Sequence, residues 1–138
     1  MYSEKPSVLA CVTSQYECDR IIDTARSLAD ERGAQLRVVS VLKPTEDYSL
    51  VCDQIEYLDR VAKDAGADMT IFFADDAARA CAQFAFENGA YHIVTGMHDG
   101  GDESFLVRFN RIAPAVSITM VDKDNTAYTM AASPCRAR

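Results

Sequence analysis

Short apolar runs alternate along the chain with segments of helical spacing, and this alternation is the feature that most limits how the chain can fold. The runs have the length of buried strands, and the segments between them repeat their apolar residues every three or four positions, as a helix packed by one face does. Strands that alternate with helices form a parallel sheet. The predicted strands are 7–12, 35–42, 69–73, 92–95 and 116–121, and the predicted helices are 17–32, 48–65, 75–88 and 104–112.

This order of elements predicts an α/β fold with a doubly wound, five-stranded parallel sheet. Right-handed crossovers give the strand order 3-2-1-4-5 and place helices on both faces. Gly33 and Gly66 stand where the first two helices should end. Residues 1–121 are therefore predicted to form one domain. Residues 122–138 are polar, and we expect either a mobile tail or an extra edge strand around Tyr128 to Met130.

Composition excludes several classes of function. Fourteen basic and 21 acidic residues give a net charge of -7, which argues against binding to nucleic acid or to an anionic membrane. No apolar run is long enough to span a bilayer, and the first residues lack the apolar core of a signal peptide, so the expected location is the cytoplasm. The five cysteines include no Cys-x-x-Cys pair, so neither a disulfide framework nor a zinc site is expected. We expect buried thiols, apart from Cys135 in the polar tail.

The loop of residues 96–104, directly after the fourth predicted strand, is the main candidate for a functional site. Ligands of open parallel sheets bind outside the carboxyl ends of the strands. Gly96, Gly100 and Gly101 allow close approach of the backbone, and a helix begins at Ser104, so backbone amides could receive a phosphate there. The alternative is an ordinary strand-to-helix connection, because three carboxylates in the loop repel phosphate unless a metal ion lies between them. They are Asp99, Asp102 and Glu103.

No arrangement typical of a catalytic centre is visible, and no catalytic residue or metal ligand is predicted. His98 could act as a base or contact a phosphate, but a solvated loop histidine is the simpler interpretation. His92 begins a strand and is expected to be partly buried. Asp75 and Asp76 are better explained by the positive end of the third helix than by a metal ion.

The ordered series of these segments resembles the universal stress protein family across residues 7–121. The resemblance is carried by residues 8–13, 93–96 and 104–114. Within that family the chain is most similar to the stress-protein-like domain of bacterial potassium-sensing histidine kinases. That subgroup shares the Cys-Val-Ser/Thr ending of the first strand and an acidic turn such as Asp75-Asp76.

The resemblance implies an adenine-nucleotide site, although the chain departs from the ATP-binding pattern. In that pattern a Gly-x2-Gly-x9-Gly-Ser/Thr loop surrounds the phosphates, and an acidic residue ends the first strand. Here Thr13 takes the acidic position, Asp99 takes that of the second glycine, and Ser104 follows Gly96 by 8 positions (104 minus 96) where the pattern needs 14. Tight ATP binding is therefore not expected. The candidate nucleotide-binding residues are Val12, Thr13, Ser14, Val41, Gly96, Met97, Gly100, Gly101 and Ser104, with the adenine near Val12, Thr13, Val39 and Val41.

Two functional hypotheses follow from the resemblance. The leading one is a non-catalytic binding or signalling module of the stress response, which forms a homodimer through the free edge of the fifth strand or docks on another protein. The alternative is a true nucleotide-binding protein, for ATP with slow hydrolysis or for a cyclic dinucleotide. No cofactor is expected beyond such an adenine nucleotide.

Overall fold

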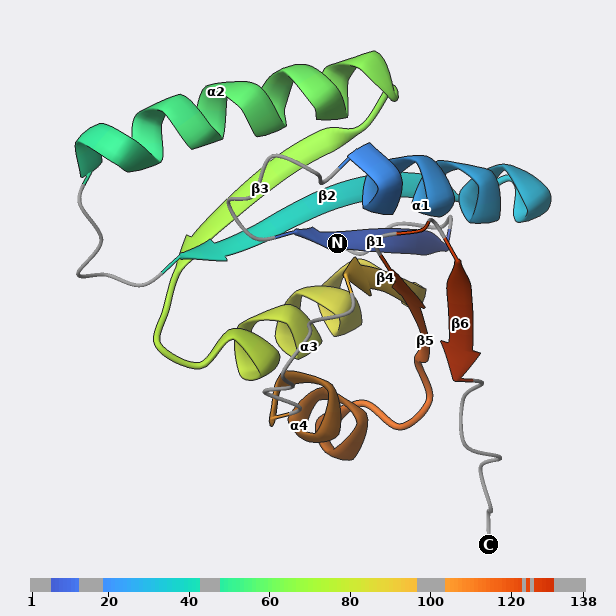
Figure 1. Cartoon of the computed structure of the whole chain (residues 1–138). Coiled ribbons are helices and arrows are strands. Elements are labelled where there is room, and N and C mark those ends of the chain that lie inside the picture. Colours follow the sequence, from blue (N-terminus) through green and yellow to red (C-terminus); the bar gives the residue numbers. More distant parts are fainter. Residues whose placement is uncertain are drawn as a thin grey trace, which may run out of the picture.

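A computed structural model describes residues 6–12, 19–42, 48–96, 104–122, 124 and 126–130. Within these ranges a six-stranded sheet lies between two layers of helices, with α1 and α2 on one face and α3 and α4 on the other (Figure 1). The strands are β1 (Ser7–Val12), β2 (Gln35–Leu42), β3 (Asp68–Phe73), β4 (Ala90–Gly96), β5 (Ser117–Val121) and β6 (Ala127–Met130), and the helices are α1 (Asp19–Arg32), α2 (Tyr48–Asp64), α3 (Ala77–Glu87) and α4 (Ser104–Ile112).

The sheet has the order β3-β2-β1-β4-β5-β6, which confirms the predicted order of the first five strands. Those five are parallel, as predicted, but a sixth strand, β6, pairs antiparallel with β5, so the sheet is mixed and six-stranded rather than parallel and five-stranded. A local turn reverses the chain. The carboxylate of Asp122 accepts hydrogen bonds from the amides of Asp124 and Thr126, each at 2.9 Å, which is a typical way for aspartate to stabilise a turn.

The position of β6 also corrects the prediction that the fifth strand has a free edge. One side of β5 pairs with β4, and residues Ile118 to Val121 pair on the other side with β6. The outer edge of the sheet therefore belongs to β6. The edge through which we expected two copies to pair is already occupied within one chain.

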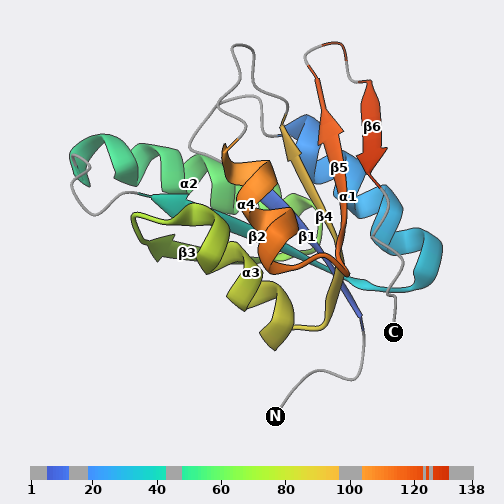
Figure 2. The ribbon, with the colours of Figure 1, turned by 90° about the horizontal axis from the view of Figure 1, so that it is seen from below.

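Alternation along each strand divides the core into two clusters. Val8, Ala10 and Val12 of β1 face α1 and α2, whereas Leu9 and Cys11 face α3 and α4. Because β1 is central, all six of its residues are buried, as its uninterrupted apolar run predicts. Figure 2 shows α3 and α4 lying in front of the sheet and α1 and α2 behind it.

The ends of the helices follow the predicted local chemistry. Asp76 is the N-cap of α3, and its carboxylate accepts a hydrogen bond from the amide of Arg79 at 3.2 Å. Gly33 and Gly66 follow α1 and α2 with φ values of 63° and 71°, a conformation that glycine adopts without strain. No helix in the described ranges combines the length and apolar character needed to cross a membrane.

Candidate functional site

Four of the nine predicted nucleotide-binding residues fall in the part of the chain that the structure describes. Val12 and Gly96 end β1 and β4, Val41 lies near the end of β2, and Ser104 begins α4. All four are therefore at the carboxyl-end edge of the sheet, as predicted. The other five lie outside the described residues: Thr13, Ser14, Met97, Gly100 and Gly101.

The structure does not bring Val12 and Val41 together. Val12 is buried in the cluster beneath α1 and α2, whereas Val41 packs against the cluster beneath α3 and α4. The strand register places Val12 beside Ser40, so Val41 is on the opposite face. A single ligand on one face of the sheet can contact only one of the two valines through its side chain.

Packing accounts for the absence of a side chain at Gly96. A Cβ atom at this position would lie 3.2 Å from Cδ1 of Ile21 on α1. That spacing is shorter than ordinary van der Waals contact between carbon atoms. Gly96 therefore lets α1 approach β4 on the face away from α3 and α4.

Four side chains define what we call the carboxyl-end surface on the α3/α4 face: Cys11, Val41, Thr95 and Met120. Cys11 pairs in register with Thr95, and Thr95 with Met120, so three of them form one row across β1, β4 and β5. Cys11 and Thr95 are buried, while Val41 and Met120 are partly buried. The partly exposed members of this surface, Val41 and Met120, are therefore apolar, and the hydroxyl group of Thr95 is buried between them.

An ion pair joins the two helices that begin beside this surface. Nη2 of Arg108 on α4 contacts Oδ2 of Asp76, the residue that caps α3. Both side chains are substantially exposed, so the pair itself contributes little to stability. Its consequence is positional, because it holds the guanidinium group of Arg108, on the second turn of α4, beside the N-cap of α3.

The surroundings of the Cys11 thiol disfavour its thiolate form. A hydrogen bond with the thiol of Cys81 and burial both raise the pKa of Cys11 well above that of an ordinary thiol. Cys11 and Cys81 are both buried and unbridged, which confirms for these two residues that the thiols pack as small apolar groups. Both effects disfavour the thiolate that covalent chemistry needs.

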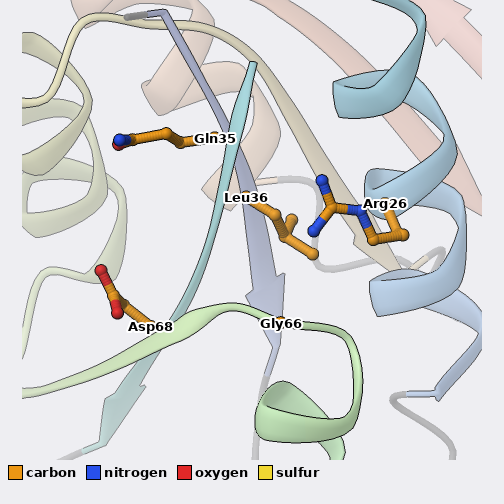
Figure 3. A pocket seen from close by; sticks show the side chains of 5 residues that line it. All are labelled: Arg26, Gln35, Leu36, Gly66 and Asp68. Atoms are coloured by element: carbon orange, nitrogen blue, oxygen red, sulfur yellow. The ribbon is translucent and has the colours of Figure 1, made fainter. Parts of the chain in front are cut away.

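A pocket of about 200 Å³ lies at the opposite end of the sheet, beside the amino ends of β2 and β3 (Figure 3). The guanidinium of its main charged residue, Arg26, already donates to the carbonyl of Ala65 at 2.8 Å and to Asp30. The volume is below the range typical of small-molecule sites. This pocket is therefore a poor nucleotide site. Its lining residues are Arg26, Gln35, Leu36, Gly66 and Asp68.

His92 takes part in a polar chain across three strands rather than in the carboxyl-end surface. Its Nε2 lies 2.6 Å from Oγ1 of Thr119, which lies 2.8 Å from Oγ1 of Thr129. Burial, and then the positive charge of Arg32, lower the pKa of His92, while Glu31 opposes them. His92 is half-buried, as predicted. Within the described ranges no cluster of three or more potential metal ligands occurs.

The lowered pKa of His92 predicts that acid destabilises the protein. Because the unfolded chain binds a proton more readily, the stability associated with His92 is full above the unfolded pKa of about 6.5 and is lost as the pH falls through the lower folded value. We expect His92→Gln, which retains a hydrogen-bonding side chain, to reduce the difference in melting temperature between pH 7.5 and pH 5.5. His98→Gln is the matched control, and an equal reduction in both variants would contradict the assignment.

The nucleotide-binding residues predicted from the sequence did not include Cys11, Thr95, Met120 or Arg108. Simple alternation within β1 and β4 could have placed Cys11 and Thr95 on opposite faces from Val12 and Gly96. Their common row, however, depends on the register between strands, which the sequence does not state. Arg108 has no local signal, because its partner Asp76 lies on another helix.

The strand order and the two helical layers define an α/β fold of the universal stress protein type. No protein-family model matches the chain, and no curated protein matches its sequence. Solved structures do match it with high TM-scores over most of its length. The comparison therefore rests on the fold.

Three of these structures are universal stress proteins. A family member from Burkholderia pseudomallei is 25% identical with a TM-score of 0.59, over 83% of this chain and 94% of the other. A protein from Archaeoglobus fulgidus in complex with dAMP is 20% identical with a TM-score of 0.62, over 84% and 96%. A universal stress protein in complex with cAMP is 18% identical with a TM-score of 0.62, over 87% and 98%.

Proposed function

We propose that the protein is a non-catalytic, universal-stress-protein-like module that binds an adenine nucleotide carrying a single phosphate at its carboxyl-end surface. The carrying observation is that Val41 and Met120, two partly exposed apolar side chains, flank the buried Cys11 and Thr95 on one face, at the edge where ligands of such sheets bind. Similar folds in complex with dAMP and cAMP support this choice of ligand.

The loop after β4 favours one phosphate over three. It is six residues shorter than the ATP-binding pattern (14 minus 8), so fewer backbone amides are available to surround a triphosphate. Its three carboxylates, Asp99, Asp102 and Glu103, would repel each added phosphate. Arg108, on the second turn of α4 beside the N-cap of α3, can exchange its contact with Asp76 for one phosphate.

The absence of a catalytic step is part of the proposal. Within the carboxyl-end surface, the raised pKa of Cys11 disfavours a thiolate, and His92 lies away from that surface on the α1 face, where it contacts Thr119. The module would then act in a stress response by binding another polypeptide, with an affinity that depends on whether the nucleotide is bound. We also propose that the protein is related to the stress-protein-like domain of potassium-sensing histidine kinases. Cyclic di-AMP is therefore included among the ligands to be tested.

We expect AMP or cAMP to raise the melting temperature more than ATP with magnesium at equal concentration. Ligand at 100 times its dissociation constant stabilises the folded state by about 2.7 kcal/mol. GMP serves as the base-specificity control. An absence of any shift with AMP, cAMP, ATP and cyclic di-AMP would refute the proposal, and a larger shift with ATP than with AMP would refute the argument from the loop.

Val41→Asp is expected to weaken AMP binding by at least about tenfold, because it places a carboxylate at the ring-binding surface and near the phosphate. Val61→Asp is the matched control, since Val61 is partly buried on α2, on the other face of the sheet. Both variants are first checked for folding by circular dichroism. Equal losses of affinity in the two variants would show that the effect is not local to the carboxyl-end surface.

A further inference from the structure

The outer face of α4 exposes apolar and basic side chains together. Val107 and Ile112 are 47% and 38% exposed, and Arg108 and Arg111 are exposed as well. Residues 107 and 111 are one helical turn apart, and so are residues 108 and 112, so the four side chains lie on one face of the helix. In Figure 2, α4 lies in front of the sheet, on the side toward the viewer. We call these four residues the α4 surface.

Packing within the chain does not account for the two apolar residues of the α4 surface. Phe109 and Ala113 are buried in the cluster beneath the helix, and neither Val107 nor Ile112 belongs to that cluster. Helix α1 also covers the sheet, yet none of its residues, all of which are described, is an exposed large apolar side chain. A single exposed apolar residue is ordinary on a soluble protein, so the informative feature is that two of them flank a pair of arginines.

The charge of α4 differs from that of the other helices. Arg108 and Arg111 are its charged residues, whereas α1, α2 and α3 each carry acidic ones. Arg108 is paired with Asp76, but in the part of the chain that the structure describes Arg111 has no acidic partner. Its place in the last turn of the helix favours a positive charge and still leaves the guanidinium donors available to another group.

We propose that the α4 surface docks an acidic, amphipathic segment of another polypeptide. A carboxylate of that segment would accept two parallel hydrogen bonds from the guanidinium of Arg111. Apolar side chains on the same segment would cover Val107 and Ile112 and remove them from water. Complementary charge then selects an acidic segment over a basic one.

The net charge of the whole chain, -7, does not oppose this choice of partner. Repulsion between exposed charges is largely screened beyond about 8 Å at physiological ionic strength, so the local charge of the α4 surface decides which partner fits. Two arginines on an acidic chain are too few for nucleic acid or an anionic membrane, which need an extended basic surface. A polypeptide segment, by contrast, needs only a few carboxylates beside its apolar residues.

The inference rests on the proposed function only for the statement that a polypeptide is bound, since the α4 surface shares no residue with the carboxyl-end surface. A parent protein that binds an acidic peptide but not AMP would refute the nucleotide site alone. A parent protein that binds AMP but no acidic peptide would overturn the docking surface alone.

An amide NMR titration of the full chain tests the docking surface. The probe is a synthetic helical peptide with glutamates beside leucines, and its control has lysine in place of each glutamate. The glutamate peptide should shift the amide signals of Val107, Arg111 and Ile112 together and to saturation, whereas the lysine peptide should not. No shift on α4 at millimolar glutamate peptide, or equal shifts with both peptides, would overturn the proposal. Shifts on α4 with anionic phospholipid vesicles and not with the glutamate peptide would overturn it in favour of a membrane.

Charge reversal at Arg111 tests the chemistry of the contact. Arg111→Glu should weaken binding of the glutamate peptide about tenfold or more and should give the lysine peptide measurable affinity. Arg60→Glu is the matched control, because Arg60 is exposed on α2, on the other face of the sheet, and the change in net charge is the same. Both variants are first checked for folding by circular dichroism. Equal losses of affinity in the two variants, or no gain with the lysine peptide, would overturn the assignment of the contact to α4.

Discussion

Phe109→Ala is expected to lower the free energy of unfolding by about 3–5 kcal/mol, the largest effect of any substitution considered for this protein. Phe109 is fully buried and packs in the cluster that includes Leu9 and Ile93 on the α3/α4 face. A domain of this kind has a total stability of only about 5–15 kcal/mol. The variant should therefore unfold at a much lower urea concentration than the parent protein.

Phe86→Ala is the matched control for Phe109→Ala. Phe86 is on α3 on the same side of the sheet, but it is 60% exposed. The same atoms are deleted in both variants, so the difference between them reports burial. We expect the free energy of unfolding to change by no more than about 0.5 kcal/mol for Phe86→Ala. Similar losses in the two variants would contradict the packing of α4 described above.

Leu58→Ala is expected to cost about 2–5 kcal/mol and to release α2. Leu58 and Ala62 are the fully buried side chains among the described side chains of this 17-residue helix. α2 packs mainly on the edge strand β3, with a smaller contact to α1. Hydrogen exchange should therefore show faster exchange of α2 amides than of β1 amides in the variant.

Leu28→Ala provides the control for Leu58→Ala. Leu28 is on α1 and packs against the same cluster, but it is only partly buried. Its removal should cost less, and α2 amides should keep the protection that they have in the parent protein. If Leu28→Ala exposes α2 to exchange as strongly as Leu58→Ala does, then Leu58 is not the residue that anchors this helix.

The first five strands and the four helices could be predicted because the spacing of apolar residues within each segment is typical of a strand or of a helix. α4 begins at Ser104 and ends at Ile112 as predicted, since apolar residues follow Ser104 at helical spacing and Pro114 comes two residues after Ile112. For the segment of β6 the sequence left two alternatives open, an edge strand or a mobile tail. Four residues after a turn are too few to show the alternation of apolar and polar residues that marks a strand. Its pairing depends on a tertiary contact with β5.

The candidate site was harder to predict than the fold. The sequence correctly placed Val12, Val41 and Gly96 at or near the carboxyl ends of their strands. It grouped Val12 with Val41 wrongly, because a shift of one residue in register reverses the face on which a side chain lies. It also assigned Gly96 to a ligand, whereas Ile21, distant in sequence, explains the glycine by close packing.

The central claim is that the carboxyl-end surface on the α3/α4 face binds an adenine monophosphate. The most direct test is an amide NMR titration of the full chain with AMP. The account predicts that the amide signals of Cys11, Thr95 and Met120 shift together and saturate. Shifts confined to Gln35, Gly66 and Asp68 around the amino-end pocket, or no shifts at millimolar AMP, would contradict it.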